Sequence, residues 1–82
     1  MGDPEREVMP LRGWRRRRLH TVRSLATAAG TATRTIVELE GGSRSPRVGT
    51  IRAISAALEV PPEQVVEFRR AMGLPVDEEA PR

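Results

Sequence analysis

The sequence predicts a single all-α domain of five short helices. Apolar residues recur at helical spacing along the centre of the chain, and no stretch alternates apolar and polar residues like a half-buried strand. Glycines and prolines interrupt this pattern at short intervals, so the helices are short. A length of 82 residues allows one small domain. We expect this domain to span residues 10–74, between a disordered acidic tail over 1–9 and a disordered tail over 75–82.

Start and stop signals place each helix in order. The first is expected to begin at Pro10 or Leu11, because proline suits the first helical position. Thr21 is a good N-cap for the second helix, and Gly30 would end it in a left-handed conformation. Two glycines then stop the third helix, and two prolines separate the fourth from the fifth. The second to fifth helices are expected over residues 22–29, 32–40, 47–58 and 62–72.

The apolar faces of these helices predict the core. Leu11 and Trp14 share one face of the first helix through their spacing of three residues. Val65, Phe68 and Met72 form a stripe on the fifth helix. The other residues expected to face inward are Leu25, Ala26, Ala29, Ile36, Leu39, Val48, Ile51, Ile54 and Leu58.

Charge divides the chain into three parts. All 14 basic residues are arginine, and the sequence contains no lysine. Residues 11–52 hold ten Arg against two Glu, a net of +8, whereas residues 1–10 carry −2 and residues 53–82 carry −3. Such a basic block predicts a surface for a polyanion. The alternative is that a GC-rich genome has enriched arginine at solvated positions.

Composition excludes several classes of function. Without cysteine the chain has no disulfides, no cysteine-based zinc site and no thiol chemistry, and its one histidine argues against a metal site. Two aromatic residues are too few for a single-strand stacking platform. We find no catalytic constellation and expect neither an enzyme nor a cofactor nor a small-molecule ligand. No apolar run approaches the ~18 residues of a membrane span, so a cytoplasmic protein is expected.

Residues 25–36, LATAAGTATRTI, have the pattern of two helices joined by a sharp turn. Ala26 is small enough for the helices to cross closely, and Gly30 allows the turn. Ile36 would fill the angle between the helices, and the second of them could then enter a DNA major groove. The pattern is moderately specific, because any helical hairpin needs a small residue and a glycine.

The likeness to a known family extends well beyond the turn. It rests on Leu11, Trp14, Arg15, Arg18, Thr21, Leu25, Ala26, Ala29, Gly30, Ile36, Leu39, Glu40, Gly42, Pro46, Ile51, Ile54, Ala57, Leu58 and Val60. In order and spacing these residues resemble the Cro/phage-repressor (Xre-type) helix-turn-helix DNA-binding family, from Leu11 to Phe68. The resemblance implies a five-helix, lambda-repressor-like domain. It also implies a sequence-specific transcriptional regulator of double-stranded DNA, most simply a bacterial or phage repressor.

The resemblance also assigns roles to individual residues. Arg34 is the strongest candidate base reader, since a guanidinium can pair with guanine O6 and N7; the alternative is a helix pair with Glu38. Arg15 aligns with a position that pairs with the glutamate ending the third helix, here Glu40. The candidate base-reading residues are Thr33, Arg34, Val37 and Glu38. The candidate phosphate contacts are Thr21, Arg23, Arg44 and Arg47.

Members of the family commonly dimerise through the fifth helix, which implies a homodimer with Val65, Phe68 and Met72 at its interface. The alternative is that this stripe closes the core. Two positions depart from the family: Val22 replaces a common glutamine, and Ala32 replaces a small polar cap, so Thr31 could cap the third helix instead. These departures keep open a second function, a protein-interaction module such as an antitoxin or adaptor, and a weaker third, an activator.

Overall fold

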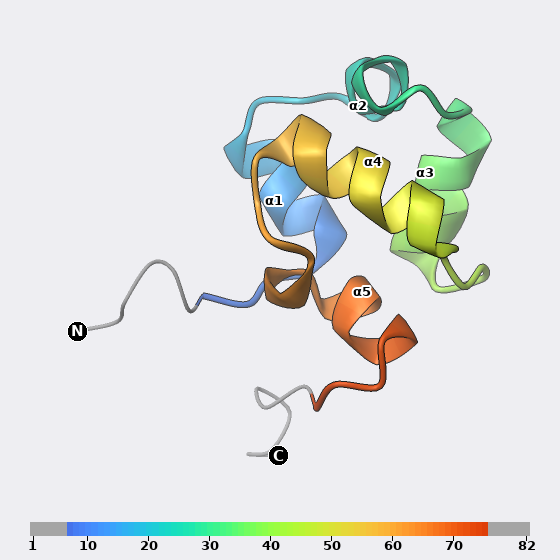
Figure 1. Ribbon diagram of the computed structural model, residues 1–82. Helices are drawn as coiled ribbons and strands as arrows, with labels where there is room; N and C mark the ends of the chain where they lie inside the picture. Colours follow the sequence, from blue (N-terminus) through green and yellow to red (C-terminus); the bar gives the residue numbers. More distant parts are fainter. Residues whose placement is uncertain (1–6, 76–82) are drawn as a thin grey trace.

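The chain forms an all-α domain, as its sequence predicts (Figure 1). The computed structural model describes residues 7–75. Their helices are α1 (Leu11–Arg17), α2 (Val22–Ala29), α3 (Thr33–Gly41), α4 (Val48–Leu58), the 3₁₀ helix η2 (Pro62–Gln64) and α5 (Val66–Ala71). α4 runs across the middle, with α2 above it, α3 at its right and α5 below it (Figure 1). Within the described residues, no helix is both long enough and apolar enough to cross a membrane.

Local signals explain the helical hairpin of α2 and α3. Thr21 and Ser24 form a reciprocal capping box, in which each side chain accepts the other's backbone N–H at 2.9 Å. Gly30 ends α2 in the left-handed conformation with φ of 69°, which glycine adopts without a steric cost. Ala26 and Ile36 are buried at the crossing of the two helices, as the pattern predicts.

One core holds the helices together. It contains residues from every element except η2, and it is closed by Val60 and Val65 in the segments before and after that element. The core residues are Leu11, Trp14, Leu25, Ala26, Ile36, Leu39, Ile51, Ile54, Leu58, Val60, Val65 and Phe68. Val48, expected inside, is instead exposed on the first turn of α4.

The fifth helix is shorter than predicted. Val65 has an extended backbone, with φ of −108° and ψ of 121°, and separates η2 from α5. It forms a parallel β-bridge with Met9, in which Met9 N–H donates to Gln64 O and Val66 N–H donates to Met9 O, both at 3.0 Å. Val66 N–H thus donates to Met9 O instead of to Pro62 O, as it would in a continuous α-helix, and the helix expected over residues 62–72 is interrupted at Val65.

The same bridge holds the end of the expected N-terminal tail against the domain. Residues 7–9 belong to the described part of the chain, and Met9 packs partly buried against the core. The remainder of that tail, residues 1–6, and residues 76–82 of the C-terminal tail lie outside the described residues.

The connection between α1 and α2 contains an unusual residue. Leu19 has φ of 62°, a left-handed conformation that a leucine rarely adopts, and its side chain is 91% exposed. His20, next to it, is half-buried, and its ring nitrogen Nδ1 lies 2.8 Å from Ser24 Oγ. The turn therefore places the histidine, not the leucine, against the body of the domain.

Candidate nucleic-acid interface

α3 buries one face and exposes the other. Ile36 and Leu39 are completely buried, whereas Thr33, Arg34 and Val37 lie on the exposed side of the helix. This separation follows from the 3.6-residue helical period and leaves a polar and arginine-bearing surface outward. α3 starts one residue later than predicted, after Ala32. No described side chain caps this start, so Thr31 does not take that role.

An ion pair fixes the end of α3. Arg15 Nε donates to Glu40 Oε2 at 2.6 Å and Arg15 Nη2 donates to Glu40 Oε1 at 3.1 Å, the pair that the family resemblance implies. The two side chains are only 10% and 6% exposed. The hydrogen bond to Glu40 raises the pKa of Arg15, since it favours the charged guanidinium. Arg15 Nη1 also donates to His20 O at 3.1 Å, which ties α1 to the start of α2.

Glu38 joins two arginines at the outer edge of α3. Its Oε2 lies 2.9 Å from Arg34 Nε, one helical turn back, and its Oε1 lies 2.9 Å from Arg44 Nε in the following loop. The hydrogen bond from Arg34, then the charge of Arg44, lower the pKa of Glu38. The Arg34–Glu38 helix pair is therefore formed, although Arg34 remains 84% exposed. The contact with Arg44 was not foreseen from the sequence.

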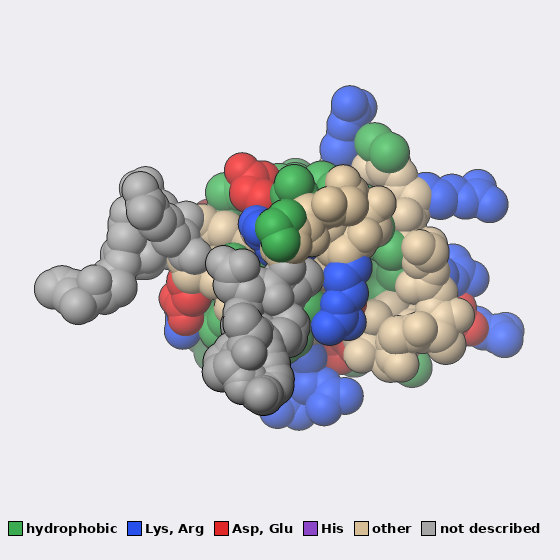
Figure 2. Space-filling view, turned by 90° about the horizontal axis from the view of Figure 1, so that it is seen from below, with side chains coloured by type: hydrophobic (Ala, Val, Ile, Leu, Met, Phe, Trp, Pro, Cys, Tyr) green, Lys and Arg blue, Asp and Glu red, His purple; other side chains and the backbone are tan. Residues whose placement is uncertain are grey.

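The candidate phosphate contacts surround α3. Arg23 is exposed in the first turn of α2, and Arg47 is exposed at the N-cap of α4. Arg44 Nη1 contacts Thr35 Oγ1 at 3.5 Å besides its pairing with Glu38. Thr21 is exposed at the start of α2, where its hydroxyl already caps the helix. Figure 2 shows arginine side chains projecting from the edge of the molecule that carries α3 in Figure 1.

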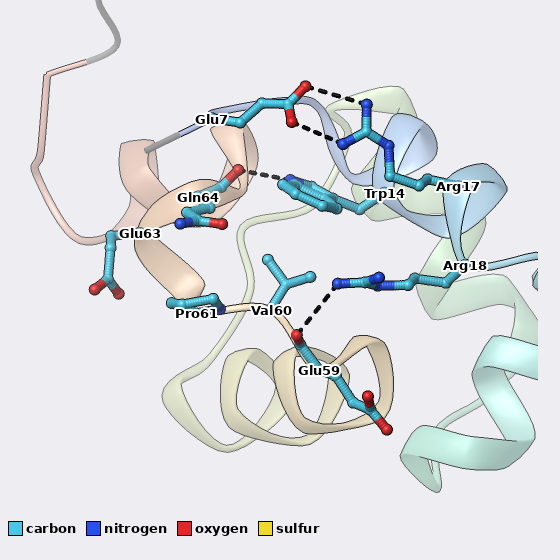
Figure 3. Close-up of a pocket in the computed structure, with 9 residues that line it drawn as sticks. All are labelled: Glu7, Trp14, Arg17, Arg18, Glu59, Val60, Pro61, Glu63 and Gln64. Carbon is cyan, nitrogen blue, oxygen red and sulfur yellow. Dashed lines mark hydrogen bonds and ion pairs between the residues drawn. The ribbon is translucent and has the colours of Figure 1, made fainter. Parts of the chain in front are cut away.

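Residues 15–18 are four consecutive arginines, and the last two of them make contacts within the domain on another face. Arg17 and Arg18 lie near the Trp14 ring, with guanidinium carbons 5.3 and 5.7 Å from its centroid (Figure 3). Arg17 donates two hydrogen bonds to the Glu7 carboxylate, and Arg18 Nε donates to Leu58 O at the end of α4, at 2.9 Å. These arginines line a pocket away from α3, so the basic block is not one surface.

The predicted dimer interface needs a correction. Val65 and Phe68 have no exposed surface in the single chain, because both close the core against the other helices. They are therefore not available to a second chain. Met72 is 43% exposed, and Leu74 beside it is also exposed, so the apolar surface at this end lies beyond α5 and not along it.

Comparison with known families agrees with this architecture. The family model described as helix-turn-helix matches residues 11–65, which is more than half of the chain and includes α1 to η2. No curated protein and no solved structure matches the chain. The chain belongs to the Cro/phage-repressor (Xre-type) helix-turn-helix family of DNA-binding regulators.

Proposed function

We propose that the protein is a sequence-specific transcriptional regulator of double-stranded DNA, and that it represses by occupying an operator. The proposal rests on the orientation of α3: its inner face is buried, and its outer face exposes Thr33, Arg34 and Val37. A helix held in this way can enter a major groove, which is wide enough to admit one. The protein would act at the chromosome of a bacterium or phage, in the cytoplasm.

Each exposed side chain of α3 suits a different contact. The Arg34 guanidinium can donate two hydrogen bonds to guanine O6 and N7, a contact worth about 1–3 kcal/mol of discrimination. Val37 can pack against a thymine methyl group, and the Thr33 hydroxyl can bond a base edge or a phosphate. Glu38 is the weakest of the four candidate readers, since each of its carboxylate oxygens already accepts from an arginine.

Contacts with the DNA backbone would orient α3 in the groove. Arg23, Arg44 and Arg47 are exposed on the elements that flank α3, and Thr21 lies near the amide-rich start of α2. Binding should weaken steeply with salt, because log K falls by about 0.9 for each neutralised phosphate per log unit of salt. A flat response to salt would contradict the proposal.

The proposal includes a homodimer that reads two half-sites about one helical turn apart. The exposed apolar side chains Met72 and Leu74 support an interface at the end that follows α5. Met72→Glu should then shift the protein to monomer in equilibrium sedimentation, while the exposed-site control Ala56→Glu should not. A wild-type protein that is monomeric at tens of micromolar would remove the dimer from the proposal.

In vitro selection from a random DNA library tests the function directly. We expect wild-type protein to enrich a palindromic sequence, and Arg34→Ala to lose preference at a defined position within it. If Arg34→Ala instead weakened binding equally for the selected DNA and for random DNA, its base-reading role would be wrong. Failure to enrich any sequence would favour the protein-interaction module. In that case variants near Met72 would abolish function and Arg34→Ala would not.

A further inference from the structure

The geometry around Glu38 leaves one part of Arg34 unoccupied. Arg34 contacts Glu38 through Nε at 2.9 Å. Its two terminal nitrogens, Nη1 and Nη2, form no hydrogen bond with any residue between 7 and 75, and the side chain is 84% exposed. Terminal guanidinium nitrogens can donate the parallel hydrogen bonds that recognise guanine. The pairing thus fixes the guanidinium without using the atoms that would read a base.

Glu38 is itself held in place from the core. Arg44 Nε contacts the other carboxylate oxygen at 2.9 Å, and Arg44 Nη1 contacts the hydroxyl of the buried Thr35 at 3.5 Å. A chain of contacts therefore runs from Thr35 through Arg44 and Glu38 to Arg34. Because a free arginine side chain loses about 2 kcal/mol of rotamer freedom when it is immobilised, anchoring it beforehand lowers the cost of binding.

We infer that Glu38 is a positioning residue that sets base specificity: it holds Arg34 so that Nη1 and Nη2 read a guanine in each half-site. The inference rests on the proposed function and changes the role of Glu38 within it, from base reader to support for Arg34. The two guanidiniums outnumber the one carboxylate, so the cluster keeps a net positive charge toward DNA. Arg44 pairs with Glu38 and is also a candidate phosphate contact, so it would link the guanine contact of Arg34 to the DNA backbone.

Base-by-base binding measurements test the inference with the full chain. The probes are the DNA selected by the wild-type protein and duplexes in which each base pair is replaced in turn. Arg34→Ala should lose about tenfold discrimination at one guanine per half-site. Glu38→Ala removes the oxygen that accepts from Arg34 Nε, so it should lose at least about threefold at the same guanine, and nothing further in the Arg34→Ala background. Glu63→Ala, which removes an exposed carboxylate on η2, is the matched control and should bind like wild type.

Replacing the guanine by a chemical analogue gives a second, independent binding measurement. 7-Deazaguanine at that position lacks the N7 acceptor, so it should weaken wild-type binding and leave Arg34→Ala binding unchanged. Arg44→Ala removes the other contact of Glu38 and should reduce the guanine discrimination as well as the general affinity. If circular dichroism shows that Glu38→Ala does not fold, Arg44→Ala tests the same link.

Two results would overturn the inference while leaving the proposed function intact. If Glu38→Ala retained full discrimination at the guanine, Arg34 would need no support from Glu38. Glu38→Ala could instead lose preference at a cytosine that Arg34→Ala does not affect, which would make Glu38 a direct reader. A wild-type protein that selects no sequence would remove the proposed function itself, and the inference with it.

Discussion

The Glu67 carboxylate on α5 accepts the backbone N–H of Leu11, at 2.8 Å, across 56 positions of the chain. α1 begins after Pro10, which has no capping side chain, so a residue of the last helix satisfies the first turn of the first helix. Trp14 Nε1 also donates to Gln64 O at 2.7 Å. α1 and the η2–α5 region therefore stabilise each other, although α5 follows the segment that the family model matches.

Glu67→Ala should lower the free energy of unfolding by about 1 kcal/mol, the usual value of a lost helix cap. Glu67→Gln should lower it less, because the amide oxygen still accepts a hydrogen bond. Urea denaturation measures both. Glu63→Ala, on η2, is the control for removing a nearby glutamate. Equal stability of the Glu67→Ala and Glu63→Ala proteins would show that the remote cap contributes nothing.

Breaking the Arg15–Glu40 ion pair should lower the free energy of unfolding more than removing the Glu67 cap does. Glu40→Ala should lower the free energy of unfolding by about 3 kcal/mol, because it leaves the nearly buried Arg15 guanidinium without its anionic partner. Thermal and urea melts check this. Replacing both partners by apolar residues, Arg15→Met with Glu40→Leu, should recover much of the loss, since no unpaired charge then remains. A Glu40→Ala protein that melts like wild type would remove the structural role of the pair.

Ser55 predicts a gain in stability. Its side-chain oxygen is buried on α4 and has no hydrogen-bond partner among the described residues. Burying an unpaired hydroxyl is unfavourable, and alanine has the higher helix propensity. Ser55→Ala should therefore raise the free energy of unfolding by about 1 kcal/mol. Ala56→Ser, at the exposed neighbouring position, measures the propensity effect alone. A less stable Ser55→Ala protein would mean that the hydroxyl is paired in solution.

Local signals explain why much of the domain could be predicted. The Thr21 cap and Gly30 fix the ends of α2 through interactions within a few residues. The helical period then places Ile36 inside and Arg34 outside. The Arg15–Glu40 pair was expected only from the family resemblance, because 25 positions separate its partners.

The features that the sequence did not predict depend on segments distant in the chain. Val65 continues a helical stripe in the sequence, but its pairing with Met9 turns it into an extended residue. The stripe alone does not show whether Phe68 faces a second chain or the core, and only the packing of the other helices buries it completely. Arg44 reaches Glu38 only through the path of the loop after α3, and no spacing rule predicts such a path.

The Glu7–Arg17 pair predicts a pH dependence of stability. Glu7 accepts hydrogen bonds from Arg17 Nη1 and Nη2 at 2.7 and 3.2 Å, and this bonding lowers the pKa of Glu7 below its ordinary value of 4.5. A pKa that is lower in the folded state means that folding favours the ionised carboxylate. The contribution is therefore complete above pH 4.5, and it is lost as the pH falls through the folded pKa.

Urea denaturation of wild type and of Glu7→Gln at several values between about pH 7 and pH 3 measures this contribution. The wild-type advantage over Glu7→Gln should shrink as the solution becomes acidic. Arg17→Ala removes the cause of the shift, so it should flatten the pH dependence as Glu7→Gln does, and the double variant should flatten it no further. Added salt should shrink the advantage at neutral pH, since both side chains are partly exposed. An advantage that stays constant with pH would show that the charge of Glu7 is not its cause.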